Sequence, residues 1–240
     1  MIFDQISSVS IEEDITWKDK VFLTFDIDWA PDFVIEQTLS LLGNIPATFF
    51  VTHDSFLINQ LKKNHQFECG IHPNFNPLLE GDFRYGKNIT AVLDYYLDIV
   101  PNAKSVRSHS MTQNSRILQC FTDKGLKYDC NHFIPYYINA DLKPWTHWDN
   151  SLIKVPYFWE DDIQAIYDNS WKFKPKKLLR SKGIKVFDFH PIHVYLNTEN
   201  LDRYQAAKPY LKDEKKLKEF INTKTYGTRD FLKELIKYEK

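Results

Sequence analysis

Two aspartates separated by one residue, Asp26 and Asp28, close the apolar run Val21–Ile27. On a strand, side chains two residues apart share a face, so these carboxylates repel each other and favour a cation or a proton between them. The carboxyl ends of parallel strands also form the active-site face of a barrel. The pair therefore favours a metal or acid–base site. The alternative is a strand end followed by an Asp-rich turn that caps the next helix.

A histidine and an asparagine, His72 and Asn76, follow a second apolar run, Phe67–Ile71. One turn of helix that begins at Pro73 is expected to place both side chains on one face. Imidazole nitrogen and amide oxygen both bind divalent metals, so the pair is a candidate for metal ligation. The alternative is a proline-rich turn in which His72 only caps a helix.

Two further apolar runs end in polar residues. Arg107 and His109 follow Val106, and His190 follows the run that begins at Val186. A buried arginine needs a carboxylate partner, and a histidine can act as a general acid near neutral pH. A single histidine at a strand end is more often structural, but four polar strand ends in one chain favour a shared site.

Short β-branched and aromatic runs alternate with helix-like segments, which is typical of a parallel α/β architecture. The expected strands are Val21–Ile27, Ala47–Thr52, Phe67–Ile71, Ser105–Arg107, Tyr128–Phe133, Ile153–Phe158 and Lys185–His190. The expected helices between them are Pro31–Leu42, Ser55–Lys63, Ile89–Ile99, Asn114–Lys124 and Pro175–Lys182. Seven such strands predict a barrel, and seven glycines without a G-x-G-x-x-G loop argue against a dinucleotide-binding sheet.

The composition narrows the classes of function. The chain has 240 residues with 31 Lys and Arg against 32 Asp and Glu, and this net charge of -1 argues against a general nucleic-acid binder. An apolar fraction of 43% with 15% aromatics predicts a folded chain. Eight histidines beside three cysteines suit a His/carboxylate site better than a thiol zinc site.

The segment Met1–Lys20 is rich in acids and has no basic start followed by an apolar run. We therefore expect no secretory signal and a cytoplasmic location. No run approaches the roughly 20 apolar residues of a membrane span. No repeat or linker divides the sequence, so one domain is expected over residues 1–240, with two Lys-rich helices, Glu214–Ile221 and Arg229–Tyr238, as a solvated face.

In their order, the polar strand ends resemble the motifs of the polysaccharide deacetylases of carbohydrate esterase family 4, the chitin-deacetylase and NodB-like group. The family motif T-F-D-D-G is similar to Thr24–Asp28, with the second acid displaced by one position. The motif H-[ST]-x-x-H is similar to His72–Asn76, with Asn in place of the second His. The arginine motif resembles Val106–Met111, and the last motif, a strand that ends in the catalytic His, resembles Val186–His190.

The resemblance is strongest to the deacetylase-like proteins found with O-antigen and capsule biosynthesis enzymes. It implies an α/β fold, a distorted, incomplete (β/α)7 barrel of the NodB-homology type. It also implies metal-dependent removal of an N-acetyl or other acyl group from an amino sugar. The expected substrate is a sugar nucleotide or a surface-polysaccharide precursor.

Carried over residue by residue, the resemblance makes Asp28, His72 and Asn76 the ligands of a divalent metal, with Zn²⁺ as the expected ion. Asn in place of His keeps the ligand neutral but weakens the affinity for zinc. Other histidines therefore stay open as the third ligand. These alternatives are His53, His109 and His193.

The resemblance also implies the catalytic roles. Asp26 is expected to be the general base, Arg107 to orient it through a bidentate pair, and His190 to protonate the leaving amine. Two aromatics are expected to wall an acyl pocket or stack on a sugar ring, and the alternative for them is ordinary core. The expected substrate-binding residues are Phe158, Trp159, Asp161 and His109.

Two other functions stay open on the sequence. The missing histidine of the second motif is compatible with a degenerate barrel that binds a glycan without turnover, although a pure binder does not need Asp26, Arg107 and His190 together. The other function is that of a related amidohydrolase acting on a non-sugar C–N bond, such as a ureide or a formamide. The supply of aromatic residues disfavours it.

Overall fold

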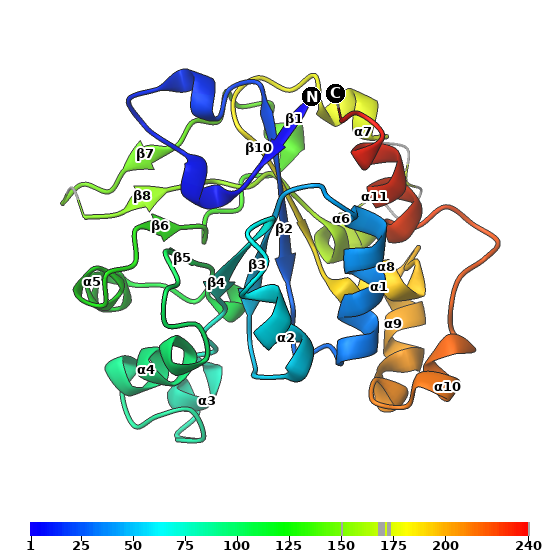
Figure 1. Cartoon of the computed structure of the whole chain (residues 1–240), viewed down its shortest axis with the longest axis horizontal. Coiled ribbons are helices and arrows are strands. Elements are labelled where there is room, and N and C mark those ends of the chain that lie inside the picture. The colour runs from blue at the N-terminus through cyan, green and yellow to red at the C-terminus, as the bar shows by residue number, and fades with distance from the viewer. Residues whose placement is uncertain (150, 168–170, 172–173, 240) are drawn as a thin grey trace.

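The structure, a computed structural model, describes residues 1–149, 151–167, 171 and 174–239 (Figure 1). Its strands are β1 Ile2–Asp4, β2 Lys20–Asp26, β3 Ala47–Val51, β4 Phe67–Ile71, β5 Ser105–Val106, β6 Tyr128–Asp129, β7 Trp145–Thr146, β8 Ile153–Lys154, β9 Trp159–Glu160 and β10 Lys185–Phe189. They form one sheet in the order β7-β8-β6-β5-β4-β3-β2-β10-β9, and β1 pairs with β2 beside this path. Among these strands every pairing is parallel except that of β7 with β8.

Helices flank the sheet on two sides (Figure 1). The α-helices are α1 Asp32–Leu42, α2 Phe56–Leu61, α3 Asn76–Leu79, α4 Ile89–Ile99, α5 Ser115–Asp123, α6 Asp161–Tyr167, α7 Pro175–Leu178, α8 Pro191–Leu196, α9 Leu201–Ala207, α10 Glu214–Lys218 and α11 Thr228–Ile236. In Figure 1, α3, α4 and α5 lie to one side of the central strands, and α1, α8, α9 and α11 lie to the other. Helix α8 contacts both α1 and α11.

The sheet curls back on itself. Strands β8 and β9 lie near opposite ends of the strand order, yet both belong to the single run 153–160. Lys154 of this run pairs with Asp129 of β6, and Trp159 pairs with Phe187 of β10. Because residues 153–160 pair with strands near both ends of the strand order, the sheet must be strongly curved. This confirms the predicted distorted, incomplete barrel.

Strand β2 shows how the sequence builds two core layers. Phe22 packs in the cluster inside the curled sheet, whereas Leu23 and Phe25 pack in the larger cluster between sheet and helices. Because side chains alternate along a strand, Thr24 and Asp26 face inward with Phe22. An apolar floor thus lies inside the barrel below polar groups at its carboxyl end.

The sequence predicted most of the central strands closely and two of them incompletely. The runs expected for β2, β3, β4 and β10 agree with the structure to within one residue at each end. The expected strand Tyr128–Phe133 ends at Asp129. The expected strand Ile153–Phe158 ends at Lys154, and β9, which was not predicted, begins only at Trp159, where the run has changed partner from β6 to β10. Helix α6 starts directly after β9, with no loop to mark its beginning. It was not predicted, and neither were β1, β7, α3, α8 and α9.

No helix in the described part of the chain is both long enough and apolar enough to cross a bilayer.

Candidate metal and catalytic site

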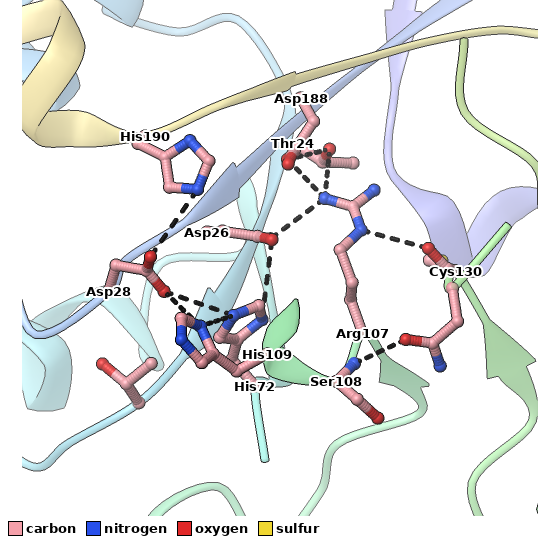
Figure 2. Close-up of polar contacts among 12 residues, drawn as sticks. Thr24, Asp26, Asp28, His72, Arg107, Ser108, His109, Cys130, Asp188 and His190 are labelled. Atoms are coloured by element: carbon pink, nitrogen blue, oxygen red, sulfur yellow. Dashed lines mark hydrogen bonds and ion pairs between the residues drawn. The ribbon is translucent and has the colours of Figure 1, made fainter. Parts of the chain in front are cut away.

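Four strand ends bring their polar residues to one place (Figure 2). Asp26 ends β2 and Asp28 follows it, His72 follows β4, Arg107 follows β5, and His190 follows β10. Parallel pairing from β10 through β2, β3 and β4 to β5 sets these ends side by side at the carboxyl edge of the sheet. The site is therefore a product of sheet order, as the sequence predicted.

Three potential metal ligands form a compact triangle. The Oδ1 atom of Asp28 lies 3.3 Å from Nε2 of His72 and 3.2 Å from Nδ1 of His109. The two ring nitrogens are 3.3 Å apart, which closes the triangle. A tetrahedral site with zinc–ligand bonds of about 2.0–2.1 Å has edges of about 3.3–3.4 Å. The donor set and its spacing therefore fit one face of a tetrahedral zinc site, with the fourth position open.

Within this triangle, Asp28 favours its ionised form. Burial alone raises the pKa of Asp28, but hydrogen bonds from His109 and His72 outweigh it and hold the pKa well below its ordinary value. Nδ1 of His72 lies 3.6 Å from Oδ2 of Asp26. With a metal in place of the hydrogen bond between Nε2 and Asp28, a carboxylate on that side favours the tautomer whose proton is on Nδ1. Asp28 is therefore an anion that can bind a cation.

The expected third ligand, Asn76, has different contacts. Its amide donates to Oγ of Ser110 at 3.2 Å and accepts from Oγ1 of Thr112 at 3.3 Å. The expected helical turn that carries both His72 and Asn76 is wrong, because α3 begins only at Asn76. Pro73 disfavours a helical conformation at the residue before it, so His72 lies outside the helix. Of the alternative histidines, the structure brings His109 to the triangle.

Left-handed backbone flanks both sides of the triangle. Asp28 and Trp29 have φ of 44° and 57°, and Ser110 and Met111, directly after His109, have φ of 55° and 52°. This region costs roughly 1–2 kcal/mol per non-glycine residue and is concentrated at functional sites. Two pairs of such residues therefore mark the turns that carry Asp28 and His109 as places where geometry outweighs local backbone preference.

Arg107 holds the expected general base. Its Nη1 lies 2.9 Å from Oδ1 of Asp26, and it also bonds Asp188 and, at 3.0 Å, Oγ1 of Thr24. One guanidinium nitrogen thus serves all three groups, so the expected bidentate pair with Asp26 is wrong. Burial alone lowers the pKa of Arg107, but Asp188 and Asp26 outweigh it and raise the pKa. The guanidinium is therefore a fixed positive charge beside Asp26.

Asp188 is a site residue that the sequence analysis missed. It is fully buried, pairs with Thr24 in the register of β10 against β2, and accepts a hydrogen bond from the Thr24 hydroxyl at 2.7 Å. Burial raises its pKa to about 8, against the opposing effect of Arg107. A signal was present, because Asp188 precedes His190 by two residues and so points to the same face of the strand.

His190 has its own carboxylate partner. Its Nδ1 lies 2.8 Å from Oδ1 of Asp161, and its backbone N–H donates to Oδ2 of the same residue at 2.9 Å. Nε2 faces the triangle, 3.7 Å from Oδ2 of Asp28. Burial alone lowers the pKa of His190, but Asp161 outweighs it and raises the pKa well above its ordinary value. His190 is therefore protonated at neutral pH, as a general acid must be.

The residues expected to contact substrate lie elsewhere. Trp159 is 1% exposed and stacks on Phe231 of α11 with ring centroids 4.3 Å apart, and Phe158 is 3% exposed. Rings covered in this way have no open face for a sugar, so a stacking role does not fit their burial. Asp161 contacts His190, and His109 belongs to the triangle.

The family model of WbmS-like polysaccharide deacetylases matches residues 23–208. A crystal structure of a candidate polysaccharide deacetylase involved in O-antigen biosynthesis, from Bordetella bronchiseptica, is 41% identical and covers 99% of this chain and 98% of that chain, with a TM-score of 0.92.

Two distant structures resemble the chain more weakly. A candidate polysaccharide deacetylase from Mycobacterium smegmatis is 17% identical, over 77% of this chain and 80% of that one, with a TM-score of 0.46. A family 4 carbohydrate esterase from Streptomyces lividans, in complex with acetate, is 14% identical over 71% and 78%, with a TM-score of 0.41. No curated protein matches the chain. On the family match and the Bordetella relative, the chain belongs to the WbmS-like polysaccharide deacetylase family.

Proposed function

We propose that the protein removes an N-acetyl group from an amino sugar of a glycan precursor, in a reaction that depends on a divalent metal. The observation that carries this proposal is the triangle of Asp28, His72 and His109, set between a held carboxylate, Asp26, and a protonated histidine, His190. Amide hydrolysis needs these three functions within reach of one bond. The Bordetella relative, described for O-antigen biosynthesis, supports a surface glycan as the substrate class.

The residues of the chain divide the work. Asp28, His72 and His109 would hold Zn²⁺, which supplies Lewis acidity toward the acyl carbonyl. Asp26 accepts a proton from the attacking water, and the adjacent Arg107 holds its carboxylate in place for that step.

The leaving group needs a proton of its own. His190 gives its proton to the amine nitrogen as the C–N bond breaks, and Asp161 stabilises the charged ring beforehand.

The site also bears on the other two candidate functions. The missing second-motif histidine was the reason to consider a non-catalytic glycan binder, and the position of His109, 3.2 Å from Asp28, supports it as a substitute ligand. The aromatic residues that disfavoured a non-sugar amide, Phe158 and Trp159, are buried. A substrate screen therefore has to include ureides and formamides beside N-acetylated sugars.

The test is acetate release by the full chain reconstituted with Zn²⁺, over N-acetylated sugar nucleotides and oligosaccharides. Asp26→Asn is expected to lower kcat by about 10²–10⁴-fold. The matched control is Asp98→Asn, on the exposed side of α4, which should keep full activity. Absence of a bound metal together with absence of any activity that depends on Asp26 rejects the proposal.

A further inference from the structure

A chain of buried polar groups lies behind the site, from Lys154 through Asp129 and Asn131 to the backbone of Ser108. These residues are at most 2% exposed. The Lys154 ammonium bonds Oδ2 of Asp129, whose Oδ1 accepts from the Asn131 side chain at 2.6 Å and from its backbone N–H at 3.0 Å. Oδ1 of Asn131 accepts from the N–H of Ser108 at 2.8 Å, a contact drawn in Figure 2. We call these groups the outer polar chain.

The outer polar chain lies on the far side of the sheet from the barrel interior. Tyr128 and Cys130 of the β6 segment pack in the inner cluster with Phe22. Because side chains alternate along a strand, Asp129 points to the opposite face. The outer polar chain therefore touches neither Asp26 nor the bond to be cleaved, and any effect on the reaction has to pass through the backbone.

That backbone is the segment between two functional residues. The N–H of Arg107 donates to the carbonyl of Ile71 at 3.2 Å, and the N–H of His109 donates to the carbonyl of Pro73 at 3.0 Å. Between them, the N–H of Ser108 donates the other way, to Asn131. Successive amides thus tie this segment first to the β4 side, then to β6, then to the β4 side again.

The charge on Asp129 fixes which way the Asn131 amide faces. An asparagine side chain offers an oxygen on one side and an NH₂ on the other, and a flip exchanges them. A carboxylate accepts hydrogen bonds only, so Asp129 turns the NH₂ toward itself and the oxygen toward Ser108. Lys154 compensates the buried charge. Breaking a buried ion pair by removing one partner costs about 3–5 kcal/mol, so the contact with Lys154 fixes Asp129 in this position.

We propose that Asn131, oriented by the Asp129–Lys154 pair, is a positioning residue that sets His109 as the third metal ligand and aims Arg107 at Asp26. This inference rests on the proposed function, because it assumes that His109 binds a metal. It assigns a task to a buried ion pair that touches neither substrate nor the metal ligands. Outer partners of metal ligands typically change metal affinity by about 10–100-fold.

The test titrates the full apo chain with Co²⁺ and records the visible absorption of the bound ion, which reports ligand geometry. Asn131→Leu, similar in volume but unable to accept the Ser108 N–H, is expected to weaken Co²⁺ binding about 10–100-fold and to change the spectrum. Asn222→Leu is the matched control. Asn222 is 3% exposed and accepts from the backbone N–H groups of Lys224 and Thr225, so its loss costs stability elsewhere and should leave the spectrum unchanged.

The outcomes separate this inference from the proposed function. Wild-type affinity and spectrum in Asn131→Leu overturn the positioning role and leave the metal site standing. Failure of the wild-type chain to bind Co²⁺ overturns both. If Asn131→Leu does not fold, Asp129→Asn combined with Lys154→Met removes both charges of the pair together. A spectrum altered in this double variant supports the inference, and an unaltered one rejects it.

Discussion

The two ends of the barrel interior differ in how the hydrogen-bonding groups of their polar side chains are satisfied, with Glu68 at the amino end only half-buried. At the amino end, both oxygens of Glu68 are satisfied by neutral donors. Oε1 accepts from the hydroxyl of Ser105 at 2.7 Å, while Oε2 accepts from the N–H of Ser7 at 2.8 Å and the hydroxyl of Thr48 at 3.1 Å. Glu68 faces inward on the same strand that leads to His72. The fold can therefore satisfy an inward carboxylate completely.

At the carboxyl end, polar atoms are left over. Nη2 of Arg107, Oδ2 of Asp188 and Nδ1 of His72 are buried and have no hydrogen-bond partner among the described residues. Buried polar groups are normally paired, and each exception has a cost of about 1–3 kcal/mol. Among the strand ends compared, the buried polar atoms without a hydrogen-bond partner lie at the carboxyl end. The proposed chemistry takes place at this end and needs atoms that can still bind or move a proton.

Removal of the Arg107 guanidinium should have the largest effect on stability at the carboxyl end. Arg107→Met leaves the buried Asp26 without its cation, so the free energy of unfolding should fall by about 3–5 kcal/mol. Urea unfolding measures this loss. Arg116→Met, on the exposed side of α5, is the control and should change stability little. A loss below about 1 kcal/mol in Arg107→Met means that the carboxylates do not depend on this guanidinium.

The next largest effect is expected at Asp161, the carboxylate partner of His190. Asp161→Asn removes the charge that raises the pKa of His190, so the pKa falls and the protonated ring is lost at lower pH. The alkaline limb of the pH–kcat profile should therefore move to lower pH, with kcat near neutral pH down by about 10²-fold. An alkaline limb that stays in place would show that His190 is not the group that titrates there.

A substitution of Glu68 tests whether the amino end of the barrel has a purely structural role. Glu68→Gln turns an NH₂ toward groups that donate, which should lower the free energy of unfolding by about 1–3 kcal/mol. Acetate release per folded molecule should not change, because Glu68 only ties the strands together. Thermal unfolding and kcat measured on the same sample check both parts. A fall in kcat at unchanged stability contradicts a purely structural role.

Asp188 should also make the stability of the chain depend on pH. Burial raises the pKa of Asp188 from 3.8 to about 8, so the folded chain keeps this proton over a range in which the unfolded chain has lost it. The stability from this group is full below about pH 4 and is lost as the pH rises through about 8. Asp188→Asn should therefore flatten the fall in unfolding free energy between these values. An unchanged slope in urea unfolding places its source in another group.

Much of this arrangement could be predicted from local signals. Asp26, His72, Arg107 and His190 each follow an apolar run whose length and composition define a buried strand, and parallel order brings such ends together. These residues needed no knowledge of side-chain contacts. The same reasoning was wrong about the helical turn expected to carry both His72 and Asn76, because α3 begins only at Asn76 and Pro73 disfavours helix before it.

Other parts depend on distant segments and carry no local signal. His109 reaches the triangle because Ser110 and Met111 turn the chain in a left-handed conformation that neither residue type favours. Trp159 is covered by Phe231, which belongs to α11 near the C-terminal end of the chain. A single sequence does not tell which aromatic ring another segment will cover.

The left-handed turns beside the triangle have a practical consequence for engineering. Met111 is 39% exposed with φ of 52°, a conformation that glycine adopts without steric cost. Met111→Gly removes the backbone strain of the folded state, which raises the free energy of unfolding. It also makes the unfolded chain more flexible, which lowers the free energy of unfolding. It is a direct way to ask whether heat resistance and metal affinity oppose each other in this protein. Where the two move in opposite directions, thermostable variants should be sought away from these turns.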